Sequence, residues 1–99
     1  MPKIILELNY SIYPEKRDEY LEIAKKMTEI IQSTSTKNYS IYENKKGSNN
    51  FSEIYLCESE IEFEAIDDNE NDEVTALTDK LFQSFIVDKK VTYSTKYEL

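Results

Sequence analysis

Hydrophobic and polar residues alternate in four separate segments of the chain. These segments are residues 3–13, 39–44, 51–58 and 91–97, and alternation of this kind is typical of strands with one apolar face. Between them, residues 14–31 and 74–85 repeat their apolar side chains at the three-and-four spacing of a helix. The order strand, helix, strand, strand, helix, strand predicts an α+β fold, the ferredoxin-like split βαβ (β-α-β-β-α-β), with helices on one face of an antiparallel sheet.

Local signals mark where the helices begin. Pro14 suits the first position of a helix, because its missing N–H would be unpaired there. Ser59 and Glu62 form an S-x-x-E pattern, which predicts that a short helix opens at this point. The alternative is an extension of the preceding strand, since residues 58–65 also alternate, but that strand would be a strongly charged edge.

The acidic segment 67–73 is similar in composition to a calcium-binding loop. A twelve-residue loop from Asp67 would place Asp72 where glycine makes the turn and Thr78 where a bidentate Glu is needed. We therefore predict no metal site, and we expect Asn71 or Asp72 to cap the helix that follows.

Length and charge narrow the class of protein. Residues 1–99 fit one single domain, and 20 Asp and Glu against 12 Lys and Arg give a net charge of −8, which would repel a phosphate backbone. We predict no nucleic acid and no membrane as partners, because no apolar run approaches the length of a membrane span. The absence of a signal-peptide pattern and the single cysteine predict a soluble cytoplasmic protein.

The two faces of the predicted sheet differ in character. The more apolar face is assigned to the helices and carries Ile4, Leu6, Leu8, Ile41, Ile54, Leu56, Val91 and Tyr93. The other face carries Ile5, Glu7, Asn9, Ser11, Tyr42, Phe51, Glu53, Tyr55, Cys57, Thr92, Ser94 and Lys96. This second face is aromatic as well as polar, so we expect a second copy of the chain to cover it and enclose a cavity in a homodimer.

A family resemblance arises from these features. The sequence predicts a strand that ends at Pro14 before an acid-rich helix, then a hairpin, and it has an aromatic and acidic segment from Phe51 to Phe63. In these features the chain resembles the dimeric α+β barrel superfamily, specifically its antibiotic-biosynthesis-monooxygenase-like branch. The resemblance implies a homodimeric barrel with a pocket between sheet and helices. It also implies the cofactor-independent oxygenation of a small aromatic, phenol-type or quinone-type compound.

The same branch includes haem-degrading enzymes, so the resemblance also raises haem as a candidate ligand. Asn9 matches an Asn on their first strand, but their Trp falls at Cys57 and their axial His has no counterpart. Tyr55 or Cys57 would then have to ligate the iron with a different set of supporting residues. We therefore expect no cofactor.

The predicted site combines six residues of the second face. Asn9 and Tyr55 would position the substrate and its developing anion, and Glu7 would accept a proton; Tyr42, Cys57 and Ser11 would contact the substrate. Each residue also has a structural alternative. Asn9 is equally suited to a cross-interface hydrogen bond, Cys57 to a small buried hydrophobe, Tyr42 and Tyr55 to dimer packing, and Glu7 to a pair with Lys96.

A non-catalytic function is the alternative to the enzyme. Residues 58–79 hold ten of the 20 acidic residues and no Lys or Arg. This acidic stretch would suit a dimeric module that binds a small ligand or a basic protein.

Overall fold

The structure is a computed structural model that describes residues 3–34, 38–68 and 71–99. Its elements are β1 (Ile4–Ser11), η1 (Pro14–Lys16), α1 (Arg17–Thr34), β2 (Tyr39–Glu43), β3 (Asn50–Cys57), α2 (Glu60–Asp68), α3 (Asp72–Ser84), η2 (Val87–Lys89) and β4 (Thr92–Tyr97). The helical region after β3 therefore consists of two consecutive helices, α2 and α3, as the two helix-start signals in the sequence indicate.

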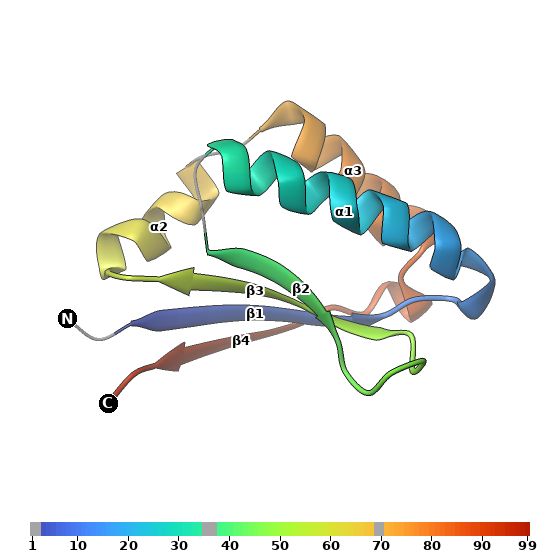
Figure 1. Cartoon of the computed structure of the whole chain (residues 1–99), viewed down its shortest axis with the longest axis horizontal. Coiled ribbons are helices and arrows are strands. Elements are labelled where there is room, and N and C mark those ends of the chain that lie inside the picture. Colours follow the sequence, from blue (N-terminus) through green and yellow to red (C-terminus); the bar gives the residue numbers. More distant parts are fainter. Residues whose placement is uncertain (1–2, 35–37, 69–70) are drawn as a thin grey trace.

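The four strands form one antiparallel sheet in the order β2-β3-β1-β4. Figure 1 shows α1 and α3 side by side above one face of this sheet, with α2 at the end where both chain termini lie. The order places the first and third strands in the centre, which is the ferredoxin-like topology. The predicted fold class is confirmed.

The helix starts use the residues that the sequence indicates. Pro14 stands at the start of η1, which leads directly into α1. The Ser59 hydroxyl accepts the backbone N–H of Glu62 at 3.3 Å, and the Asn71 side chain accepts the N–H groups of Glu73 and Val74 at 2.9 and 3.2 Å. These caps satisfy donors that a helix start otherwise leaves unpaired. The strand extension over 58–65 is wrong, since β3 ends at Cys57 and α2 occupies residues 60–65.

The strand pairing corrects the predicted face of β3. Residues opposite one another in a ladder point to the same side, and β1 pairs Ile4 with Cys57, Leu8 with Glu53 and Tyr10 with Phe51. Odd-numbered residues of β3 therefore face the helices, and even-numbered residues face away. These faces are the reverse of those predicted from the alternation of β3, because a shift of one residue moves all the side chains of a strand to the other face.

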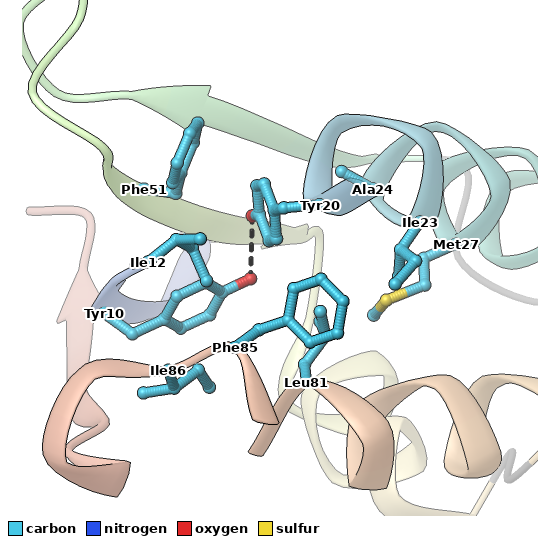
Figure 2. Packing of buried hydrophobic residues seen from close by; sticks show 10 residues of the cluster. All are labelled: Tyr10, Ile12, Tyr20, Ile23, Ala24, Met27, Phe51, Leu81, Phe85 and Ile86. Atoms are coloured by element: carbon cyan, nitrogen blue, oxygen red, sulfur yellow. Dashed lines mark hydrogen bonds between the residues drawn. The ribbon is translucent and has the colours of Figure 1, made fainter. Parts of the chain in front are cut away.

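Large aromatic and aliphatic side chains fill the space between sheet and helices. Figure 2 shows the cluster of Tyr10, Ile12, Tyr20, Ile23, Ala24, Met27, Phe51, Leu81, Phe85 and Ile86. The cluster joins β1 and β3 to α1 and to the end of α3, so it fixes the position of α1 over the sheet. No helix in the described part of the chain is both long and apolar enough to cross a membrane.

Candidate functional site

A cavity of about 360 Å³ opens between α1 and the neighbouring strands β2 and β3. It is lined by Tyr20, Leu21, Ala24, Lys25, Thr28, Glu29, Ile41, Glu43 and Phe51. We call it the helix-side cavity. Its aromatic and aliphatic wall, with charged groups among the lining residues, has the composition of a small-molecule site.

A buried carboxylate lies beside the wall of the helix-side cavity. Glu53 is paired with Ile41 of the cavity wall and is only 6% exposed. Its Oε2 accepts the Tyr10 hydroxyl and its Oε1 accepts the Tyr39 hydroxyl, each at 2.6 Å. Burial raises the pKa of the Glu53 carboxyl, and the two tyrosine hydrogen bonds oppose that rise without cancelling it.

Tyr20 connects this carboxylate to the cavity. Its hydroxyl lies 2.9 Å from that of Tyr10, a contact drawn as the dashed line in Figure 2. Its ring lies against Phe51 with the centroids 4.4 Å apart. Burial is the main cause that raises the pKa values of the Tyr10, Tyr20 and Tyr39 hydroxyls, so all three remain protonated donors at neutral pH.

An ion pair borders the cavity at the start of α1. Arg17 donates to both carboxylate oxygens of Glu43, at 2.6 and 3.0 Å, and to the Asn49 side chain at 2.8 Å. The Arg17 hydrogen bonds lower the pKa of Glu43 to about 2. This bidentate contact ties α1 to the β2–β3 hairpin, so it holds together the elements that enclose the cavity.

The opposite face of the sheet carries a polar network around Asn9. The Asn9 amide donates to Asn50 Oδ1, the Phe51 carbonyl and Ser52 Oγ at 2.9 to 3.2 Å, and Asn50 Nδ2 donates to Ser11 Oγ at 3.0 Å. The Asn9 amide therefore has protein partners within its own subunit.

Glu7 belongs to the same network. It accepts the Ser52 hydroxyl at 2.8 Å and the Lys96 ammonium at 3.3 Å. The bonds from Ser52 and Lys96 lower the pKa of Glu7. The predicted cross-sheet pair with Lys96 is confirmed, whereas the raised pKa that a general base requires is not present in this arrangement.

The structure divides the six predicted site residues between the two faces. Asn9, Glu7, Ser11 and Tyr42 lie on the face away from the helices, as expected. Tyr55 and Cys57 do not, because they pair with Leu6 and Ile4 on the helix side.

On the helix side, Tyr55 and Cys57 have different surroundings. The Tyr55 ring packs against that of Tyr39, with the centroids 4.7 Å apart, so Tyr55 lies next to the Glu53 cluster. Cys57 is 1% exposed, and burial followed by the nearby Glu62 raises the pKa of its thiol. Cys57 is therefore a small buried hydrophobic residue, which is the structural alternative to substrate contact that the sequence allowed.

The group that the sequence did not reveal is Glu53 with Tyr10, Tyr20 and Tyr39. Its one sequence signal is a Glu that shares a face of its strand with Phe51 and Tyr55, a position that disfavours an unpaired charge. Within residues 3–34, 38–68 and 71–99, no three His, Cys, Asp or Glu side chains are grouped as metal ligands would be.

Comparison with known proteins identifies the fold. No protein-family model matches the chain, and no curated protein matches its sequence. A conserved protein from Methanosarcina mazei is 15% identical with a TM-score of 0.75, covering 100% of this chain and 95% of that one. A Caulobacter crescentus protein titled "putative antibiotic biosynthesis monooxygenase" is 10% identical with a TM-score of 0.76, covering 95% and 87%.

A NIPSNAP-like domain protein from Burkholderia xenovorans is also similar, at 16% identity and a TM-score of 0.68, with 98% of this chain and 84% of that chain covered. At such identities the similarity establishes the fold alone. The chain therefore has the ferredoxin-like α+β fold of the antibiotic-biosynthesis-monooxygenase-like proteins, as the sequence resemblance predicted.

Proposed function

We propose that the protein is a cytoplasmic homodimer that oxygenates a small phenol-type or quinone-type compound with O₂, without a metal or organic cofactor. The observation that carries this proposal is the helix-side cavity, whose aromatic and aliphatic wall lies against the buried Glu53 and its tyrosines. The monooxygenase name of structural neighbours supports the reaction class.

The reaction needs little from the protein. A phenol with a free ring position takes one oxygen atom of O₂ into the ring and becomes a quinone. The other oxygen atom leaves as water with the two hydrogen atoms that the phenol loses. The ionised phenol supplies the electrons, so the site must hold the ring, promote loss of its proton and exclude water.

The cavity supplies these conditions from named groups. Tyr20 provides aromatic surface for a ring, and Ile41 and Ala24 keep the site apolar. Tyr55 lies beside Tyr39, next to the Glu53 carboxylate, while Asn9, Ser11, Glu7 and Tyr42 would lie on the face covered by the second subunit.

The homodimer is supported by the apolar end of that face. Ile5 pairs with Leu56 there, and Ile54 pairs with Glu7, which is the next pair on the same face. All three apolar side chains are partly exposed. Tyr42 on the same face is 56% exposed. An apolar and aromatic patch of this kind on an antiparallel sheet favours a two-fold symmetric contact between copies.

A panel of phenols and hydroquinones, measured by thermal shift and by oxygen uptake, tests the function. A ligand at a hundred times its Kd stabilises the folded state by about 2.7 kcal/mol. Ala24→Leu, which fills the helix-side cavity, should abolish the shift and the oxygen uptake. Ala76→Leu on the exposed surface of α3 is the matched control and should leave both in place.

Asn9→Ala distinguishes the two possible locations of the ligand. If Asn9→Ala removes the shift and Ala24→Leu does not, the ligand lies between the subunits and not beside α1. A panel that gives neither a shift nor oxygen uptake contradicts the proposed function.

The second candidate is a module that binds a basic protein through the acidic stretch. Its support is Ile61 of α2, which is 80% exposed between the exposed Glu60 and Glu62. An apolar side chain among carboxylates suits a basic amphipathic partner. Association should then slow as salt rises, and an Ile61→Ser variant should bind more weakly; binding to a basic peptide that is insensitive to salt contradicts this candidate.

A further inference from the structure

We propose that Tyr20 and Tyr10 conduct the proton of a phenolic ligand from the helix-side cavity to Glu53, which holds it while the phenolate reacts. This inference rests on the proposed function, since it assigns the proton acceptor of that reaction. Tyr20 would touch the ligand, and Glu53 would act through the two tyrosines.

The hydrogen bonds define the direction of the chain. The Tyr10 hydroxyl has one proton and donates it to Glu53 Oε2. Either oxygen of the Tyr10–Tyr20 contact can donate, and with Glu53 ionised the Tyr10 oxygen is the acceptor and the Tyr20 hydroxyl the donor. The order is Tyr20 to Tyr10 to Glu53, so every proton points away from the cavity wall and towards the carboxylate.

This polarity leaves the Tyr20 oxygen as a further acceptor. The Tyr20 oxygen donates its only proton to Tyr10, and a hydroxyl oxygen can also accept. A phenol O–H is the donor that would complete the chain. Proton transfer along it breaks the ligand O–H bond, moves one proton across each of the three hydrogen bonds, and ends with a phenolate and a neutral Glu53.

A ligand reaches Tyr20 only if its ring replaces the Phe51 ring that covers Tyr20. Tyr20 is 0% exposed, and the Phe51 ring covers it with the centroids 4.4 Å apart. A ligand ring that displaces the Phe51 ring restores the same kind of contact on Tyr20, so the aromatic interaction is replaced and not lost. Both rings already line the cavity.

Glu53 is suited to receive the proton. In the described part of the chain its hydrogen-bond partners are Tyr10 from β1 and Tyr39 from β2, and none of the ion pairs there includes it. Protonation therefore removes a buried charge that no cation balances, and burial already raises the pKa of this carboxyl. After transfer, the chain reverses and Tyr20 donates a hydrogen bond to the phenolate.

Proton release on binding of para-nitrophenol, measured by pH-stat below the pKa of the free phenol, tests this inference, because the absorption of visible light reports the phenolate formed. In the wild type the phenolate should form without proton release, because Glu53 keeps the proton, whereas Tyr20→Phe and Glu53→Gln should release about one proton for each phenolate formed. Tyr39→Phe is the matched control. It removes an equally short hydrogen bond to Glu53 outside the chain and should keep the wild-type behaviour.

The outcomes separate the two proposals. If phenolate formation releases the same number of protons in all four proteins, the proton chain is refuted while ligand binding stands. If no phenol binds the wild type, the proposed function fails and the chain with it. Should Glu53→Gln not fold, the comparison of Tyr20→Phe with Tyr39→Phe decides alone.

Discussion

The dependence of stability on pH tests the buried charge of Glu53 without any ligand. The perturbation is Glu53→Gln, which keeps the shape of the side chain and removes its ionisation. In the unfolded chain this carboxyl titrates near its ordinary value of 4.5, and in the folded chain burial raises the pKa. Between these two pKa values the folded state binds a proton that the unfolded state has lost, so stability falls as pH rises through this window.

The size of the effect follows from one proton. A single group contributes a slope of at most about 1.4 kcal/mol per pH unit inside the window and none outside it. Other carboxylates titrate in both proteins, so they cancel in the difference. The free energy of unfolding of Glu53→Gln minus that of the wild type should therefore be flat below about pH 4.5 and rise above it. Changed hydrogen bonds to Tyr10 and Tyr39 shift the whole curve but leave its slope.

Urea unfolding followed by circular dichroism, at a series of pH values and constant ionic strength, gives this difference. Glu58→Gln is the matched control, because Glu58 is an exposed carboxylate just after the same strand. A pH-dependent slope that appears in Glu53→Gln and not in Glu58→Gln is assigned to the buried carboxyl. A Glu53→Gln curve that is flat or falls with pH would refute the reasoning, because it would mean that folding does not hinder ionisation of Glu53.

Three further predictions concern other parts of the molecule. Asn71→Ala should cost about 1 kcal/mol of stability through loss of the α3 cap, which lowers Tm by roughly 4–8 °C, and Asn71→Asp should retain the cap; equal Tm values for all three proteins contradict the capping role. Cys57 should react with a thiol reagent far more slowly in the folded protein than in urea, and equal rates would show that it is accessible. Ile54→Asp should convert the proposed dimer to monomers in size-exclusion light scattering, whereas Leu21→Asp on exposed α1 surface should not; a wild type that is already monomeric contradicts the dimer.

The sequence predicts the elements of this fold well because their signals are local. Pro14, Ser59 and Asn71 act on backbone groups within a few residues, and the alternation of β1 places Ile4 correctly in the core. The face of β3 has no such local signal, since Phe51 and Tyr55 alternate with Ile54 and Leu56 and both sets are hydrophobic. Its orientation is decided by pairing with β1, and the sequence alone does not reveal that register.

The candidate site was missed for the same physical reason. The reversed face of β3 put Glu53 on the side expected to meet a second copy of the chain, and its partners are 43 residues away at Tyr10 and 14 residues away at Tyr39. Only the folded register brings both hydroxyls to the carboxylate. Once they are there, burial of Glu53 is consistent with the rule that buried charges are hydrogen-bonded.

The corrected face of β3 also changes the basis of the dimer proposal. Predicted to pack under the helices, Ile54 and Leu56 instead lie beside Ile5 on the face away from them, while Tyr55 and Cys57 leave that face. The surface offered to a second copy is thus more aliphatic at one end than the sequence indicated, and it is closed by hydrogen bonds around Asn9 at the other. The aliphatic end would gain most from being covered, whereas the Asn9 network needs no partner to satisfy it. The dimer contact should therefore centre on Ile54, and chemistry should be sought on the helix side, where the buried carboxylate lies.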